Sequence, residues 1–199
     1  MTDMDIVDVY LNRIKDEPKK TALTVDQIKR LWNGIGTDLN PDFKLDDVTA
    51  KICRSIFESQ KGLIVAGSKG IGKTLSFDIY RRICIGIFKQ SCEAWETKEI
   101  EIVYKSQGSG IIEQLAKIDV LIINDLGLES AKLMDFGTER NIISDLLYLR
   151  YRAYQTDKKR TYITTNLSKE SLNQRYGDRL AERFNEMFNF IVVTGGSKR

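Results

Sequence analysis

Short apolar runs alternate with longer amphipathic segments along most of the chain, from residue 62 to the C-terminal end. Buried strands are short and almost continuously apolar, and such runs predict strands at 62–66, 99–104, 119–124, 160–165 and 189–194. Apolar residues at helical spacing predict helices at 73–90, 109–117, 138–155, 169–176 and 178–187. This alternation indicates an α/β fold with a central parallel five-stranded sheet between helices.

The N-terminal region is more polar and follows a helical pattern. Thr24 can cap a helix whose apolar residues recur at helical spacing, namely Ile28, Leu31, Trp32 and Ile35. A second amphipathic helix, at 46–59, leads into the first strand. We expect residues 1–42 to form a small helical arm that can dock a partner, with Trp32 packing on the core or on that partner. Residues 43–199 then form the main domain, without a separate C-terminal lid domain.

A glycine-rich loop lies between the strand at 62–66 and the helix that follows it. It fits the pattern G-x-x-x-x-G-K-[ST] with the residues Gly67, Ser68, Lys69, Gly70, Ile71, Gly72, Lys73 and Thr74, followed by Leu75. The glycines allow a tight turn that points successive N–H groups inward, where the dipole of the next helix also favours an anion. Lys73 can pair with phosphates, and the hydroxyl of Thr74 can bind Mg2+. The loop therefore predicts a P-loop protein that binds a nucleoside triphosphate at residues 67–75.

The strand at 119–124 looks like the second motif of such proteins, an apolar strand that ends in acids. Asn124 stands where the metal-side acid is expected, and Asp125 follows it. Two assignments are open. In the first, Asp125 orients the attacking water and Thr74 holds Mg2+, with Asn124 able to bind a metal-bound water through its carbonyl. In the second, Asp125 binds the metal, and Glu129 or no residue acts as the base.

Composition and charge narrow the function further. The chain has 199 residues, a net charge of +3 and ordinary proportions of hydrophobic and charged residues, which indicate one globular domain and give little support for a dedicated DNA-binding module. The absence of histidine excludes Ser-His-Asp and Cys-His catalysis. Three cysteines without CxxC spacing argue for reduced thiols and against a zinc site. No signal-like start and no membrane-length apolar stretch is present, so we expect a cytoplasmic protein that is not in a membrane.

Five motifs occur in a characteristic order: GSKGIGKT (67–74), VLIINDLG (120–127), TYITTNLS (161–168), RYGDRLAERF (175–184) and GGSKR (195–199). Over residues 43–199 this set resembles the DnaC-type helicase loaders of the AAA+ superfamily and the related transposition helper ATPases of the IstB type. The resemblance implies a RecA-like AAA+ core that binds ATP and Mg2+. It also assigns four further residues: Asn166 as sensor 1, Arg183 as the arginine finger with Arg179 as the second candidate, and Arg199 as the sensor 2 arginine.

The function implied by the resemblance is that of an ATP-hydrolysing DNA replication accessory protein. It would form a homo-oligomer when ATP is bound, hydrolyse ATP slowly as a monomer, and act on a replicative helicase, with single-stranded DNA as a further ligand. The alternatives are an IstB-like helper that acts on a transposase, and a nucleotide-gated adaptor with little hydrolysis, which Asn124 would permit. A small-molecule kinase is disfavoured because no lid segment is evident. Initiator-type relatives carry an extra helical element before the strand at 119–124 that faces single-stranded DNA. Only a short segment with one short helix is expected there in this chain, which argues against the DNA contact but not against the ATPase role.

Overall fold

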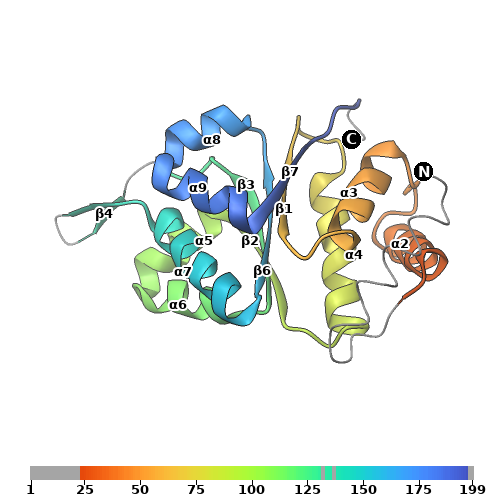
Figure 1. Cartoon of the computed structure of the whole chain (residues 1–199), viewed down its shortest axis with the longest axis horizontal. Coiled ribbons are helices and arrows are strands. Elements are labelled where there is room, and N and C mark those ends of the chain that lie inside the picture. Colours follow the sequence, from red (N-terminus) through yellow and green to blue (C-terminus); the bar gives the residue numbers. More distant parts are fainter. Residues whose placement is uncertain (1–22, 131–132, 136–137, 197–199) are drawn as a thin grey trace.

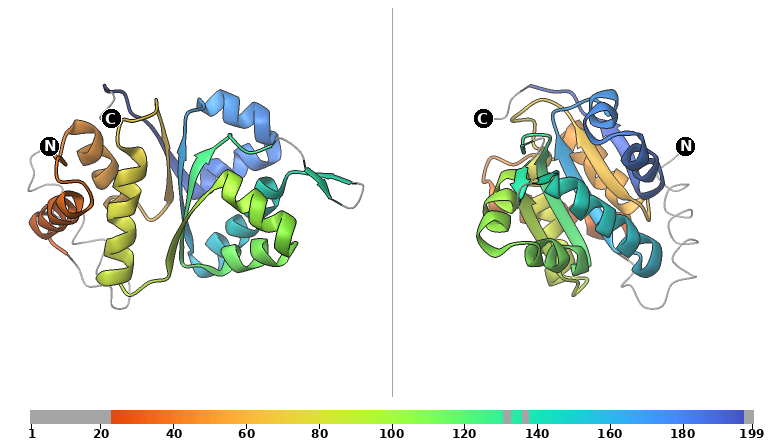
Figure 2. Two further views of the ribbon diagram at one scale, coloured as in Figure 1. Left: turned by 180° about the vertical axis from the view of Figure 1, so that it is seen from behind. Right: turned by 90° about the vertical axis from the view of Figure 1, so that its left-hand side faces the viewer.

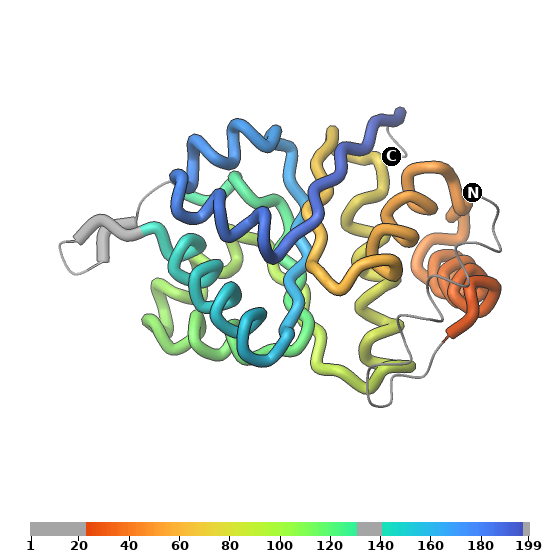
Figure 3. Tube along the Cα trace, in the orientation of Figure 1, coloured from red at the N-terminus to blue at the C-terminus, as the bar shows by residue number. Residues whose placement is uncertain are grey.

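The computed structural model describes residues 23–130, 133–135 and 138–196. Five parallel strands form the central sheet in the order β2-β3-β6-β1-β7. Their bounds are β1 (Gly62–Ala66), β2 (Cys92–Glu96), β3 (Val120–Leu126), β6 (Arg160–Thr165) and β7 (Phe188–Val192). The chain path brings β7, from the C-terminal end, beside β1 (Figure 3). The predicted α/β fold with a five-stranded parallel sheet is confirmed.

Helices cover both faces of this sheet (Figure 1). One face carries α2 (Val25–Leu39), α3 (Asp47–Phe57) and α4 (Lys73–Gly86). The other carries α5 (Thr97–Gln107), α6 (Gly110–Lys117), α7 (Ile142–Asp157), α8 (Lys169–Tyr176) and α9 (Asp178–Met187). Alternate residues of β3 enter the two cores, with Val120 and Ile122 on the α4 side and Leu121 and Ile123 on the other. Because both faces of β3 are covered, its sequence is a continuous apolar run.

The predicted strand at 99–104 is wrong, because these residues belong to α5. Ile100 and Tyr104, four residues apart, are buried, whereas Ile102 between them is 68% exposed. This is helical spacing, which a short apolar run hides. The actual strand β2 precedes it and contains Glu93 and Glu96, since it lies at the edge of the sheet and is only partly covered.

The corrected position of β2 also changes the connection to β3. Two helices, α5 and α6, fill this connection in place of one short helix. The expectation of a short segment before β3 was therefore wrong, and its cause was the misplaced strand.

Two helices differ from the predicted bounds by four residues at one end, and α3 and α6 differ by one or two residues. The helix predicted at 138–155 begins only at Ile142, because the Asn141 side chain accepts a hydrogen bond from the backbone N–H of Ser144 (3.0 Å) and caps the helix there. The residues before it pair as an antiparallel hairpin, β4 (Leu133–Asp135) with β5 (Thr138–Arg140), that projects from the body of the molecule (Figure 2). The helix predicted at 73–90 ends at Gly86, just before a turn in which Lys89 has a positive φ. Helices α8 and α9 have the predicted bounds.

The described part of the N-terminal arm packs against the main domain. Thr24 caps α2 as predicted, and its backbone N–H in turn donates to the side chain of Gln27 (2.8 Å). Trp32 is fully buried and meets the ring of Phe57 edge-on, with 6.3 Å between centroids. Residues 1–22 of the arm lie outside the described residues. No helix in the described part of the chain is long and apolar enough to cross a membrane.

Candidate nucleotide site

The predicted phosphate-binding loop, 67–74, connects the carboxyl end of β1 to the start of α4, in the centre of the sheet. The residue at the start of α4, Gly72, has φ of 95°, a conformation that side-chain-bearing residues rarely adopt. The N-terminus of α4 has no side-chain cap, so its free N–H groups and the positive end of its dipole face the loop.

Lys73 is the most enclosed charged group of the loop. Its Nζ donates to the backbone carbonyls of Gly67 (2.6 Å) and Ser68 (2.7 Å), and to Oδ1 of Asn166 at the end of β6 (3.1 Å). Burial lowers the pKa of Lys73, and the nearby carboxylate of Asp125 acts in the opposite direction. The structure thus brings together residues predicted from three separate motifs.

A cavity of about 640 Å³ lies over this loop. Its loop wall consists of Lys69, Gly70, Gly72, Lys73, Thr74 and Leu75, and Asp125 lies beside them. Gly67 and Ser68 contribute through the carbonyls that hold Lys73, whereas Ile71 is fully buried in the core and anchors the loop. The opposite wall comes from the segment between α2 and α3: Asn40, Asp42, Phe43, Lys44 and Asp46. Sequence reasoning missed this wall, because it has no motif and is brought to the loop only by the packing of α2 and α3.

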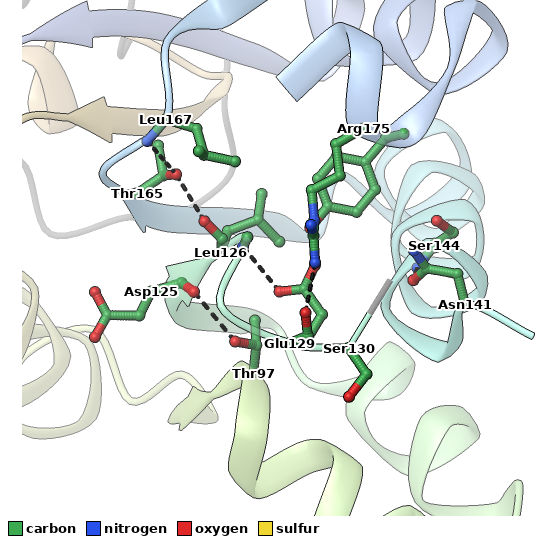
Figure 4. A network of polar contacts seen from close by, with 12 residues as sticks. Thr97, Asp125, Leu126, Glu129, Ser130, Asn141, Ser144, Thr165, Leu167 and Arg175 are labelled. Atoms are coloured by element: carbon green, nitrogen blue, oxygen red, sulfur yellow. Dashed lines mark hydrogen bonds and ion pairs between the residues drawn. The ribbon is translucent and has the colours of Figure 1, made fainter. Parts of the chain in front are cut away.

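The two polar residues at the end of β3, Asn124 and Asp125, lie in different surroundings. Asn124 is buried, and its Oδ1 accepts a hydrogen bond from the hydroxyl of Thr164 (3.2 Å). Asp125 lies on the cavity and has a positive φ of 57° at an irregularity in the pairing of β3 with β6. Its backbone is held on both sides. Its N–H donates to Oγ1 of Thr164 (2.9 Å). Its carbonyl accepts from Oγ1 of Thr97 (3.1 Å) (Figure 4).

The carboxylate of Glu129 is engaged away from the cavity. It accepts hydrogen bonds from the backbone N–H of Gly127 (2.8 Å), from Nε of Arg175 (3.0 Å) and from the hydroxyl of Tyr176 (Figure 4). Figure 4 shows the Asp125 carboxylate pointing away from this group. Of the two carboxylates that the sequence left open as acid or base, only Asp125 therefore faces the cavity.

The two helical arginines lie on α9 and do not line the cavity of their own molecule. Arg183 lies over two rings of α7, with its guanidinium carbon 4.4 Å from the centroid of Tyr148 and 5.2 Å from that of Tyr151. Arg179, one turn earlier, is exposed. Arg199 lies outside the described residues.

The donor set fits Mg2+ only together with other oxygens. Thr74 and Asp125 supply one hydroxyl and one carboxylate beside the loop. In the described part of the chain, no cluster of three or more acidic, histidine or cysteine side chains could hold a metal ion by itself. Mg2+ commonly takes one or two protein carboxylates and completes its shell with phosphate and water oxygens, and the residues present suit that mode.

No protein-family model matches the sequence, and no curated protein matches it. Solved structures do match. The DnaC helicase loader is 24% identical with a TM-score of 0.63, over 83% of this chain and 99% of that one. DnaI is 21% identical with a TM-score of 0.61, over 80% and 89% of the two chains. The replication initiator DnaA bound to AMPPCP and single-stranded DNA is 12% identical with a TM-score of 0.60, over 78% and 49%.

These likenesses confirm the predicted resemblance at the level of the fold. Three features define this fold: the strand order, the position of the loop after β1, and helices on both faces of the sheet. The chain has the fold of the solved DnaC and DnaI helicase loaders.

Proposed function

We propose that the chain is an ATP-binding and ATP-hydrolysing DNA replication accessory protein of the DnaC helicase-loader type. The observation that carries this proposal is the cavity over residues 67–74, where Lys73, Thr74 and Asp125 meet beneath a second wall. Asn166 joins them through its hydrogen bond to Lys73. A cationic loop, a hydroxyl, a carboxylate and an amide around one cavity suit a triphosphate and its metal ion.

Lys73 would exchange its present partners for phosphate on binding. The carbonyls of Gly67 and Ser68 accept hydrogen bonds from its ammonium, and phosphate oxygens are stronger acceptors because they are charged. Burial lowers the pKa of Lys73, and a bound polyphosphate would raise it again by stabilising the charged form. The carbonyls of Gly67 and Ser68 would therefore lose their hydrogen bonds to Lys73 as the phosphates enter.

Asp125 and Asn166 are the residues that we propose to act at the γ-phosphate. Mg2+ would neutralise charge on the phosphates, with Thr74 and Asp125 as the protein groups that hold it or its bound water. Asn166 lies within hydrogen-bonding distance of Nζ of Lys73, which supports the proposal that its amide contacts the same phosphate or the attacking water. Asn124 is already bonded to Thr164 and brings no negative charge, which favours slow hydrolysis.

A neighbouring copy would complete the site. Arg183 and Arg179 lie away from the cavity of their own molecule, as expected for residues offered to another subunit. The rings of Tyr148 and Tyr151 on α7 restrict the side chain of Arg183. Arg183 would therefore lose less conformational entropy when it contacts the nucleotide of a neighbouring copy. An arginine supplied in trans contributes about 10^3- to 10^5-fold in rate, so the isolated monomer should hydrolyse ATP slowly.

The proposed partners are a replicative helicase and single-stranded DNA. A likeness that covers 99% of the solved chain of the DnaC helicase loader supports the first. The likeness to DnaA bound to single-stranded DNA supports the second. Two helices, α5 and α6, lie between β2 and β3, where only a short segment was expected, which removes one argument against DNA contact.

Turnover and assembly measured together test the proposal. The wild-type protein should bind ATP, form larger assemblies with ATP and Mg2+, and hydrolyse ATP faster when single-stranded DNA is present. Arg183→Ala should bind ATP as the wild type does and lose the stimulated turnover, whereas Arg179→Ala, one turn away on the same helix, serves as the matched comparison. A wild type that binds no ATP would contradict the proposal, and unchanged turnover in Arg183→Ala would remove the finger assignment.

Asn124 supports one second candidate, a nucleotide-gated adaptor with little hydrolysis. Its amide is tied to Thr164 and replaces a charged acid beside Asp125. The adaptor would show nucleotide-dependent assembly with turnover at background under all conditions, which the same assay separates from an ATPase.

A further inference from the structure

The turn that follows β3 has an uncommon backbone. Asp125 has φ of 57° and Gly127 has φ of 101°, and the N–H of Leu128 donates to the carbonyl of Asp125 (3.1 Å). A left-handed conformation is sparsely populated by a residue with a side chain, and it persists where surrounding contacts fix it. This turn is also what presents the Asp125 carboxylate to the cavity.

Three threonines fix the sheet side of the turn. Thr164 and Thr97 bind the N–H and the carbonyl of Asp125. The hydroxyl of Thr165 donates to the carbonyl of Leu126 (2.7 Å) (Figure 4). None of these three hydroxyls reaches Gly127 in the contacts of the described chain, so the far side of the turn needs another anchor.

Glu129 is that anchor. Its Oε2 accepts the N–H of Gly127 at 2.8 Å, and its side chain is 0% exposed. A buried carboxylate is costly unless it is paired, and Arg175 and Tyr176 pair it, with Nε of Arg175 3.0 Å from Oε1. Arg175 also donates to the backbone carbonyl of Glu129 (2.5 Å), so side chain and main chain are both held. The carboxylate therefore has a fixed direction, toward the turn.

We propose that Glu129 is a positioning residue for Asp125, acting through the N–H of Gly127, and that Arg175 and Tyr176 hold it in place. This inference rests on the proposed function, because it concerns how Asp125 is presented to a bound nucleotide and its metal ion. The interaction is local: one residue, Leu126, separates Gly127 from Asp125, and Asp125 and Gly127 both have a positive φ. Without Glu129, the turn loses its anchor on the side away from the sheet, and the Asp125 carboxylate loses its fixed direction.

The chain offers a matched control for the test. Glu101, on α5, is also buried and also accepts a backbone N–H from the same loop, that of Ser130 (2.7 Å), but it does not contact the turn at Gly127. Glu129→Gln and Glu101→Gln each remove one buried negative charge next to the same loop. Only the first removes a charged acceptor from the turn of Asp125.

We would measure three quantities for wild type, Glu129→Gln and Glu101→Gln: nucleotide affinity without Mg2+, the Mg2+ concentration that gives half-maximal turnover, and kcat at saturating ATP. Glu129→Gln should lower kcat or raise the Mg2+ requirement by about 10- to 100-fold, as loss of an outer partner of a metal ligand does, with Mg2+-free affinity unchanged. Hydrogen exchange of the Asp125 and Gly127 amides in the nucleotide-free protein should quicken in Glu129→Gln and not in Glu101→Gln. Equal effects of the two variants, or none, would overturn the inference.

A triple variant separates positioning from simple stability. Glu129→Leu with Arg175→Met and Tyr176→Phe removes the buried carboxylate together with the two side-chain donors that pair it and keeps similar volume, an exchange that is often neutral for stability. The positioning role predicts a thermal midpoint close to that of wild type with kcat still low, whereas recovery of kcat along with stability would overturn it. If the wild type binds no nucleotide, the proposed function fails and this inference fails with it. If the wild type hydrolyses ATP and Glu129→Gln matches it in every readout, this inference alone fails.

Discussion

Two adjacent residues at the end of β3, Asn124 and Asp125, lie in different surroundings because the backbone is irregular at Asp125. In a regular strand they would face opposite sides of the sheet. The positive φ of Asp125 breaks that alternation and brings its carboxylate to the cavity, while Asn124 bonds to Thr164. Replacement of an acid by Asn124 is therefore a change in charge near the site, and the acid that faces the cavity is retained.

Gly127 carries the clearest prediction at this scale. Gly127→Ala should destabilise the protein by about 1–3 kcal/mol, because the residue has φ of 101° and a Cβ would lie 2.4 Å from Cδ1 of Leu167. Urea unfolding measures the change. Gly110→Ala is the matched control, since a Cβ there meets nothing within 4 Å, and it should be neutral or slightly stabilising. Equal stability of the two variants would contradict the strained backbone and the close contact with Leu167 described for Gly127.

The thiol of Cys53 predicts a loss of stability at alkaline pH. Burial raises its pKa from 9.0 to about 12, against the opposing effect of Arg54 and Lys29. The unfolded chain then releases this proton at lower pH than the folded protein does, so the contribution is present below pH 9 and is lost as the pH rises toward 12. Urea unfolding at about pH 8 and about pH 10 should show a smaller decrease for Cys53→Ala than for wild type. A decrease of equal size in both proteins would contradict this.

At the scale of elements, one buried arginine joins four of them. Arg150, on α7, donates to the carbonyls of Ala116 and Ile118 at the end of α6, to the carbonyl of Arg160 and to the hydroxyl of Thr161 on β6. The carbonyl of Ile118 lies just before β3. Burial lowers the pKa of Arg150 to about 10, with Asp119 acting in the opposite direction. This residue fixes where β3 and β6 begin, and hence where their functional ends lie.

Arg150→Met should cost at least about 3 kcal/mol of stability, because it leaves several buried acceptors without a donor. Chemical unfolding measures the loss. Arg152→Met, two residues along the same helix and exposed, should change stability by less than about 0.5 kcal/mol. A small effect of Arg150→Met would show that other groups hold these strands.

The elements also show what the sequence could and could not predict. The loop at 67–74 and the helices α8 and α9 have strong local signals, namely glycine spacing and the cap of α8 by Ser168, and they were predicted at their actual positions. The edge strand β2 was missed because its half-covered residues include two glutamates. The wall at 40–46 and the anchor role of Glu129 depend on contacts between segments distant in sequence, such as that of Glu129 with Arg175, and no local pattern indicates them.

At the scale of the whole molecule, the packing of α2 and α3 beside α4 explains why the segment after α2 and the 67–74 loop line one cavity. Helix α2 packs through Trp32 into the apolar cluster on the α4 side, and the segment after it forms the second wall of the cavity. The opposite layer carries α9 with Arg179 and Arg183. A nucleotide would thus lie between the 67–74 loop and the segment between α2 and α3 of one molecule, facing the α9 of another. The docking role of residues 1–42 stays a proposal.

Mixing two inactive variants tests whether the loop of one copy and Arg183 of another form one site. Lys73→Ala keeps Arg183 but lacks the loop charge, and Arg183→Ala keeps the loop but lacks the finger. Each alone should lose stimulated turnover, with a finger worth about 10^3- to 10^5-fold. Mixed assemblies should recover part of it, because an intact loop of one copy can meet an intact Arg183 of the other. A mixture as inactive as its components would contradict a site shared between subunits.

The central claim is that a triphosphate lies against Lys73 in the 67–74 loop. An equilibrium titration of ATP tests it most directly, on wild type, Lys73→Ala and the control Lys98→Ala, whose lysine is exposed on α5. Loss of a charge-assisted contact of about 1.5–3 kcal/mol predicts about 10- to 100-fold weaker binding for Lys73→Ala, with Lys98→Ala unchanged. Full ATP affinity in Lys73→Ala would contradict the account.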